Sequence, residues 1–289
     1  MRYLVRRAQA PDLDHIALFT TDTFVWGDYV AAEFPEWLGD PAGVAHVAET
    51  PSGDVIGVLR TIMLADREAW HHGARVHPDH RRSGVASELY AAGSSWARSR
   101  GALIERLMVE DWNESAGAQV RALGFRHVAP WMSAVLAVGS EVLPTTNGGR
   151  RVAGEERLAP ARSADTDVAW MAWSSSDVAR RGRELFSWGW HFRRMTVIDV
   201  HDAATQRSLW HCPSGWVMAR LDENGLLCVP WMATSDLDIA RLLRAVIDLA
   251  DGLRAERIRV LSPRIEWIEE AATRAGFALT PSHIYARSD

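Results

Sequence analysis

Lysine is absent from the sequence, and every basic side chain other than histidine is arginine. This bias indicates a GC-rich, bacterial genome and says nothing about chemistry. The two cysteines, Cys212 and Cys228, form no CxxC pair, so the sequence predicts no disulfide framework and no metal site. No apolar run approaches the ~20 residues of a membrane span, and the first residues lack the apolar stretch of a signal peptide. We therefore expect a cytoplasmic protein without a membrane partner.

Positive net charge is also lacking, since the chain carries −5 at pH 7. Proteins that bind nucleic acid are usually basic, so we expect no nucleic-acid partner. Apolar residues make up 47% of the chain, which is enough for a normal core. The length of 289 residues predicts two domains rather than one. We expect a monomer or a homodimer.

Strand and helix signals alternate through the first half of the chain. Apolar, β-rich runs predict strands, 3.6-residue periods predict helices, and glycine or proline marks their ends. The predicted strands are 3–7, 44–49, 55–64, 68–76, 103–109 and 127–138, and the predicted helices are 12–17, 24–37, 84–100 and 115–123.

The second half repeats this order. Its predicted strands are 157–162, 216–221, 226–232, 258–261 and 283–287, and its predicted helices are 165–174, 177–192, 236–253 and 265–275. Both halves end in a helix closed by Gly-Phe, at Gly124-Phe125 and Gly276-Phe277, which indicates an internal duplication. A segment rich in Pro, Thr, Asn and Gly at 141–154 predicts a linker between domains 1–140 and 155–289.

The most informative segment follows the predicted strand 68–76. It reads Val-His-Pro-Asp-His-Arg-Arg-Ser-Gly-Val-Ala-Ser and places an Arg-x-x-Gly-x-Ala loop before a helix. Consecutive backbone N–H groups at a helix N-terminus bind a pyrophosphate well, and Gly84 and the small Ala86 let phosphates approach the backbone. Arg81 and Arg82 add positive charge.

This segment resembles the GNAT (GCN5-related N-acetyltransferase) superfamily, whose loop reads [Arg/Gln]-x-x-Gly-x-[Gly/Ala]. A second element agrees, because Asn113-x-x-Ala116 followed by Gly124-Phe125 is similar to a family signature. The resemblance implies an α/β (α+β) fold of two GNAT-like domains, each a mixed, mostly antiparallel sheet with helices on both faces. It implies acetyl-CoA as cosubstrate. The residues that would bind it are Ala74, Val76, Arg81, Arg82, Ser83, Gly84, Val85, Ala86, Ser87 and Asn113.

The sequence departs from the family where the catalytic residues are expected. Many members place a tyrosine four residues before the closing glycine, as the acid that protonates the leaving thiolate, and Val120 stands there. An alkyl group donates no proton, so Ser115 or water is left for this role. Ser115 also fits a helix cap near Asn113.

The base is open as well. Family members that use a carboxylate often place it at the position of Trp70. Because side chains alternate along a strand, Glu68, Trp70 and His72 share one face unless a bulge intervenes. His72 and Glu68 are therefore the candidates to take a proton from an ammonium group, with an ordinary strand role as the alternative.

A weaker resemblance to histidine N-acetyltransferases concerns the acceptor. It rests on Trp26-Gly27-Asp28-Tyr29 and the segment after Arg75. It implies a free amino acid or similar amine as substrate, contacted by Asp28, Tyr29, Trp37 and Trp70. Asp28 could pair with an ammonium group or be a solvated helix charge.

The second half has no phosphate loop. Thr234-Ser235-Asp236-Leu237-Asp238 stands in its place, without glycine and with carboxylates that would repel a pyrophosphate. We therefore expect a degenerate second domain. The function expected of the whole chain is direct acetyl transfer to a primary amine of an amino acid, a peptide-like metabolite or an amine antibiotic. A peptide or protein N-acetyltransferase and a non-catalytic acyl-CoA sensor are the alternatives.

Overall fold

The computed structural model describes residues 3–21, 27–139 and 156–288. The predicted linker 141–154 and the start of the predicted helix 24–37 lie outside these residues. The chain forms two compact units: unit 1 comprises 1–108, 115–126 and 285–289, and unit 2 comprises 109–114 and 127–284. No helix in the described part is long and apolar enough to cross a membrane.

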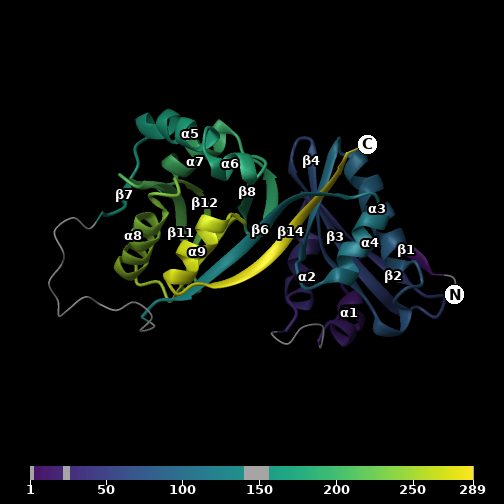
Figure 1. Cartoon of the computed structure of the whole chain (residues 1–289). Helices are drawn as coiled ribbons and strands as arrows, with labels where there is room; N and C mark the ends of the chain where they lie inside the picture. The colour runs from purple at the N-terminus through teal and green to yellow at the C-terminus, as the bar shows by residue number, and fades with distance from the viewer. Residues whose placement is uncertain (1–2, 22–26, 140–155, 289) are drawn as a thin grey trace. The chain divides into compact units, whose positions relative to one another are not determined.

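Unit 1 is built on a sheet with the strand order β1-β2-β3-β4-β5-β14. Strands β1 to β4 pair antiparallel, and β4 pairs parallel with β5. Helices α1 and α2 cover one face of the sheet and α3 covers the other (Figure 1). Its elements are β1 (Leu4–Arg7), α1 (Asp12–Thr20), α2 (Val30–Gly39), β2 (Gly43–Glu49), β3 (Val55–Ala65), β4 (Glu68–Val76), the 3-10 helix η1 (Pro78–His80), α3 (Val85–Ser99), β5 (Ile104–Glu110) and α4 (Glu114–Ala122).

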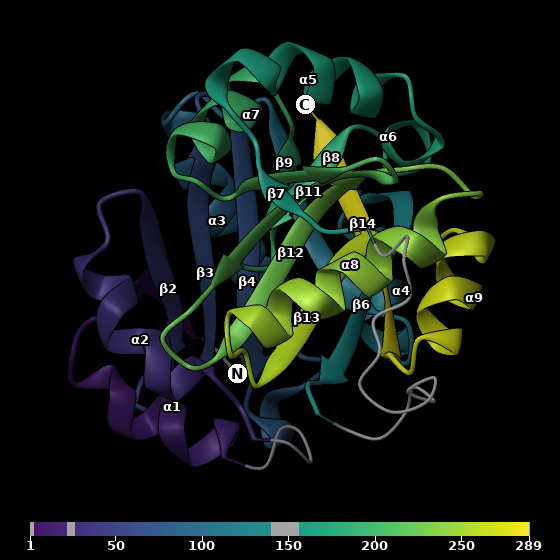
Figure 2. The same cartoon turned by 90° about the vertical axis from the view of Figure 1, so that its left-hand side faces the viewer.

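Unit 2 has a sheet with the order β6-β13-β12-β11-β10-β7, and β8 and β9 form a separate hairpin. Helices α8 and α9 pack side by side on one face, whereas α5 and α7 pack together on the other (Figure 2). Its elements are β6 (Arg126–Ala137), β7 (Ala159–Pro160), η2 (Ser163–Asp165), α5 (Thr166–Ser174), α6 (Asp177–Arg181), β8 (Leu185–Trp188), β9 (His191–Arg194), α7 (Val197–Thr205), β10 (Leu209–Cys212), β11 (Gly215–Leu221), β12 (Leu226–Ala233), α8 (Ile239–Gly252), β13 (Arg257–Pro263), α9 (Glu266–Arg274) and β14 (Ala278–Ser288).

The two units repeat one order of elements. In unit 1, β3 and β4 form an antiparallel pair, α3 follows, β5 pairs parallel with β4, and α4 comes next. In unit 2, β11, β12, α8, β13 and α9 repeat that order with the same pairing. This agreement supports the predicted duplication.

The predicted helix 177–192 is wrong. The helix α6 ends at Arg181, and the chain then turns through Arg183 and Glu184, both with φ 56°, into the hairpin β8–β9. A second turn at Gly189 and Trp190, with φ 61° and 69°, closes this hairpin. Such left-handed residues cannot continue a right-handed helix. The sequence reading also missed α7, although the Thr196 and Asp199 side chains form a capping box at its start.

The two units exchange parts of their last strands, which the predicted domain boundaries did not include. Strand β6 follows α4 directly, yet residues 127–137 belong to unit 2. The end of β14, from Tyr285 onward, belongs to unit 1. Nearly all of the first half's last strand, and the end of the second half's last strand, thus belong to the other half's unit. The boundaries at 140 and 155 fall at the edges of a segment outside the described residues and stay predictions.

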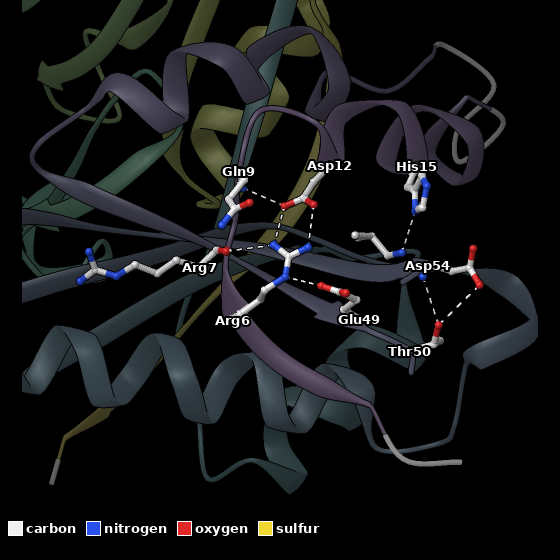
Figure 3. A network of polar contacts seen from close by, with 9 residues as sticks. Arg6, Arg7, Gln9, Asp12, His15, Glu49, Thr50 and Asp54 are labelled. Carbon is white, nitrogen blue, oxygen red and sulfur yellow. Dashed lines mark hydrogen bonds and ion pairs between the residues drawn. The ribbon is translucent and has the colours of Figure 1, made fainter. Parts of the chain in front are cut away.

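An ion-pair network fixes the first elements of unit 1. Arg6 of β1 donates to both carboxylate oxygens of Asp12 at 2.8 Å and also pairs with Glu49 of β2 (Figure 3). Burial alone would raise the pKa of Asp12, but hydrogen bonds from Arg6 and from the Gln9 N–H hold it below its usual value. The first turn of α1 is thereby tied to the sheet.

A buried carboxylate joins four elements around the centre of unit 1. Glu105 of β5 is bonded by His71 of β4 at 2.7 Å, Ser94 of α3 at 2.5 Å and Arg287 of β14 at 3.0 Å. Burial would raise the pKa of Glu105, but these hydrogen bonds lower it to about 2.

The ring of His71 is neutral in this cluster, because burial lowers the pKa of His71 more than Glu105 raises it. With an ionised Glu105 as acceptor, Nε2 carries the proton, and Nδ1 accepts from the Thr61 hydroxyl at 2.9 Å. At neutral pH, His71 is therefore neutral and Glu105 is ionised.

Glu105→Gln is expected to destabilise the protein by about 3 kcal/mol at neutral pH, because it leaves Arg287 without its buried counter-charge. The lowered pKa of Glu105 means that its stabilisation is complete above the unfolded value near 4.5 and is lost as pH falls toward about 2. The variant should therefore show a flatter dependence of stability on pH between those values. Urea unfolding followed by circular dichroism at several pH values measures this.

The exposed turn residue Asp66 provides the matched control, since Asp66→Asn also removes one carboxylate. An equal effect of the two substitutions would show that the buried cluster contributes nothing specific.

Candidate active site

The Arg-x-x-Gly-x-Ala loop lies on the surface of unit 1 at the N-terminus of α3. Residues Arg81 to Gly84 are exposed, and Gly84 adopts φ 90° immediately before the first helical residue, Val85. Arg82 is also left-handed, with φ 61°. The first N–H groups of a helix have no partner within the helix and carry its positive dipole end. The loop therefore offers backbone donors to an anion, with the guanidinium groups of Arg81 and Arg82 nearby in sequence.

Strands β4 and β5 separate next to this loop. Their parallel pairing covers Glu68↔Ile104 through Trp70↔Arg106, and in the described residues no pair follows along β4. Ala74 and Val76 lie on the part of β4 beyond that point, as the predicted coenzyme contacts require. An extended ligand could pair with this strand edge as an additional strand would.

A β-bulge in β4 sets the direction of the side chains here. The register with β3 shifts between Val58↔Arg75 and Arg60↔His72, so Gly73 and Ala74 together oppose one residue, and Gly73 adopts φ 66°. Because this bulge comes after His72, Trp70 and His72 keep a common face, whereas a second register shift, between Met63 and Ala65, falls opposite Ala69 and Glu68. His71, on the other face, packs against Tyr90 of α3.

The face that carries His72 is packed against α2. The Trp37 ring stands edge-on to His72 with centroids 5.2 Å apart, and Tyr29 stands edge-on to Trp37 at 6.4 Å. The Trp37 indole N–H donates to Glu33 at 3.3 Å. Burial raises the pKa of Glu33 even though this hydrogen bond acts in the opposite direction. Tyr29, Trp37 and His72 thus lie together, and their roles in the reaction stay predictions.

Asp28 fits neither predicted role. Its side chain is 1% exposed, and its two oxygens accept from Arg75 at 2.6 and 3.2 Å. It also accepts from the Val30 N–H at 3.0 Å at the start of α2. The carboxylate is therefore neither solvated nor left to pair with an ammonium group. It orients Arg75, whose guanidinium lies 5.6 Å from the centre of the Tyr29 ring.

Two further predicted residues are committed to other contacts. Glu68 forms an ion pair with Arg106 of β5, and both side chains are largely buried. Protonating Glu68 would break this pair, which favours His72 as the proton acceptor. Trp70 is only 2% exposed and belongs to the core of unit 1.

The residues at the start of α4 are placed only in part. Ser115 is exposed and is the second residue of α4, which begins at Glu114, so it lies inside the helix and not at the predicted cap; its role as proton donor stays a prediction. Asn113 belongs to unit 2 by its contacts, so its assignment to the coenzyme remains a prediction. Val120 is 3% exposed and buried beneath the helix.

The sequence analysis missed a tyrosine beside α4. The Tyr285 hydroxyl, from β14, accepts a hydrogen bond from Arg121 at 3.2 Å and would lie 3.6 Å from a Cβ atom at Gly117. Side chains on a helix lean toward its N-terminus, so the tip of a residue at 120 reaches the surface near 116 and 117. Tyr285 therefore brings a phenol to that surface. The sequence near α4 contains no motif that predicts this contact, because Tyr285 comes from β14, far along the chain.

Comparisons with known proteins agree with this architecture. A family model described as the acetyltransferase (GNAT) family matches residues 11–125. No curated protein matches the chain. A GCN5-related N-acetyltransferase from Sphaerobacter thermophilus is similar over 99% of this chain and 95% of its own, with TM-score 0.68 and 12% identity.

Two further solved structures have the same fold. A tandem GNAT protein from the clavulanic acid biosynthesis pathway is similar over 99% of this chain and 98% of its own, with TM-score 0.60 and 12% identity. A GCN5-related N-acetyltransferase from Kribbella flavida is similar over 99% and 71%, with TM-score 0.51 and 16% identity. Among the described residues, no group of three or more His, Cys, Asp or Glu side chains could hold a metal ion.

Gly73→Ala is expected to disturb the site through the bulge. A Cβ atom there would lie 2.5 Å from the Trp37 ring, in a backbone conformation at φ 66°. Gly53→Ala is the matched control, because Gly53 has φ 92° and nothing within 4 Å of its Cβ position. The left-handed backbone alone costs about 1 kcal/mol, and the clash should add about 1–3 kcal/mol at Gly73 only. Equal losses of stability in urea unfolding would contradict the packing of Trp37 against the bulge.

Proposed function

We propose that this chain, whose residues 11–125 match the acetyltransferase (GNAT) family, is an N-acetyltransferase that moves an acetyl group from acetyl-CoA to the primary amine of a small molecule. The observation that carries the proposal is the exposed loop Arg81–Gly84 with the first turn of α3, which follows the part of β4 where no pair with β5 is found among the described residues. The loop amides would hold the pyrophosphate, and the edge at Ala74 and Val76 would hold the pantetheine arm.

The acceptor would enter on the face of β4 that carries His72. At this face Tyr29 is 42% exposed, the buried Trp37 ring packs against the imidazole of His72, and Arg75 is neutralised by Asp28. A compact, partly apolar amine suits such a surface better than a strongly anionic one. That chemistry supports a small-molecule acceptor.

The reaction needs one proton acceptor and one proton donor. His72 would take a proton from the ammonium group, since a histidine changes charge near neutral pH. The neutral amine then attacks the acetyl carbon, and the amide N–H at the Gly73–Ala74 bulge would stabilise the oxyanion. The C–N bond forms, the C–S bond breaks and the thiolate takes up a proton, while the nitrogen releases its second proton to solvent.

Tyr285 is the residue that we assign as proton donor to the thiolate. Arginine can only donate, so the phenol oxygen is the acceptor in the bond with Arg121. A phenol in this position fills the role that Val120 cannot perform. A small apolar residue at 120 and a glycine at 117 leave room for the ring of Tyr285 under α4.

Gly84→Val tests the donor site. A branched side chain at φ 90° strains the loop and covers the amides, so acetyl-CoA binding measured by calorimetry should fall by at least about 100-fold. Gly53→Val, at φ 92° in a surface turn, is the control and should bind normally. Retained binding in Gly84→Val would refute the loop assignment.

The pH dependence of thiol release, measured across a panel of amines, tests the acid–base roles. His72→Ala should remove the acidic limb of the kcat/KM profile, and Tyr285→Phe should lower kcat by about 100-fold and remove the alkaline limb. Neither change should alter acetyl-CoA affinity. Unchanged profiles would remove these residues from the mechanism, and acetyl-CoA binding without thiol release from any amine would mean that the chain is a sensor instead.

A further inference from the structure

Unit 2 contains an open cavity at the carboxyl end of β12. Its volume is ≈ 700 Å³, and its walls include Trp216, Ala233, Asp236 and Trp267. The lining residues come from the turn before β11, the end of β12, the start of α6 and the first turn of α9. A space of this size accommodates a small organic molecule.

The cavity occupies the same place in unit 2 that the donor loop occupies in unit 1. The parallel pairs of β12 with β13 end at Val229↔Val260, so the last residues of β12 are unpaired on that side, as in β4. The segment from Thr234 to Asp238 then leads into α8, as the donor loop leads into α3. Unit 2 has therefore kept an opening between its strands but replaced the loop beside it.

The segment from Thr234 to Asp238 is acidic, whereas the donor loop of unit 1 is basic. Among the described lining residues, Asp177, Asp236 and Asp238 are acidic and none is basic. Asp238 is bonded by Ser235 at 2.6 Å and pairs with Arg241, and Asp177 pairs with Arg180. Hydrogen bonds from these partners hold the pKa of both carboxyls below the usual value, so both are ionised at neutral pH.

Arg241, the basic side chain that contacts this wall, is already neutralised, whereas Arg244 lines a neighbouring pocket together with Asp236. Arg241 contacts Ser214 at 3.0 Å on the cavity wall, but it also pairs with Glu156 at 3.4 Å as well as with Asp238. Asp236 is exposed and forms no ion pair within the described residues. One carboxylate in the wall thus remains without a counter-charge.

Two tryptophan rings complete the wall. Trp216 is half-buried, and His211 stacks on it with centroids 5.0 Å apart and 30° between the planes, which fixes its orientation. Trp267 lies in the first turn of α9, where its indole helps to keep the pKa of the neighbouring Asp177 carboxyl low. Fixed indole faces beside a carboxylate favour an organic cation, because the ring faces and the carboxylate attract positive charge together.

We propose that this cavity is a second ligand site, which binds a small organic cation with an apolar or aromatic part. The ammonium group would pair with Asp236, and the apolar part would lie between Trp216 and Trp267. The inference rests on unit 2 alone and is independent of the proposed transfer reaction in unit 1.

Benzyltrimethylammonium is a suitable probe, because it carries a permanent charge and has no N–H that could be acetylated. We expect calorimetry on the full chain to show saturable binding at millimolar concentrations, and phenylacetate, an anion of similar size, not to bind. Asp236→Asn and Trp267→Leu should each weaken benzyltrimethylammonium binding by about tenfold, or 1.4 kcal/mol.

Asp202→Asn, an exposed carboxylate of α7 outside the cavity lining, is the control and should leave the affinity unchanged. Gly84→Val should also leave it unchanged, which separates this site from the donor site. The proposal is overturned if the probe does not bind, or if Asp236→Asn binds it as well as the unaltered protein does. Asp236 is exposed, so a failure of that variant to fold is not expected.

Discussion

The ionised carboxylate of Glu105 is the constraint on which unit 1 depends. An unpaired charge in a core would be strongly destabilising, so the fold must bring it donors from β4, α3 and β14 at the same time. Satisfying these bonds fixes where β4 and β5 run together. Beyond the last pair, at Trp70 and Arg106, the strands are free to separate, and the candidate site lies next to that separation. The unpaired edge of β4 and the buried Glu105 cluster thus follow from the same placement of β4 and β5.

Local features were predictable from the sequence because their signals are local. The loop before α3, the order of elements around it, and the shared face of Trp70 and His72 all follow from short-range patterns. Non-local features were not. The pairing of Asp28 with Arg75 joins residues far apart in the chain, and Tyr285 reaches α4 from the last strand. The hairpin β8–β9 was mistaken for helix because its turns use arginine, glutamate and tryptophan at positive φ, where glycine is the usual signal.

The two units show what a duplicated architecture keeps and what it changes. Both retain a parallel strand pair that opens toward a helix N-terminus. In unit 1 the adjoining segment has arginines and a left-handed glycine, whereas in unit 2 it has aspartates and no glycine. The backbone of the sheet determines where the strands separate, whereas a few side chains determine the charge beside that separation. A short segment can therefore reverse the electrostatic character of the opening while the sheet stays the same.

The membership of β14 in both units affects how the protein can be made. Arg287 completes the Glu105 cluster, and Tyr285 lies against α4, yet the ribosome adds both of them long after α4, which ends at Ala122. At about 5–20 residues per second, Tyr285 and Arg287 are synthesised many seconds after α4. Unit 1 therefore cannot finish folding as an independent N-terminal domain during synthesis. Any truncation that removes the end of the chain damages the first unit, although most of its sequence is intact.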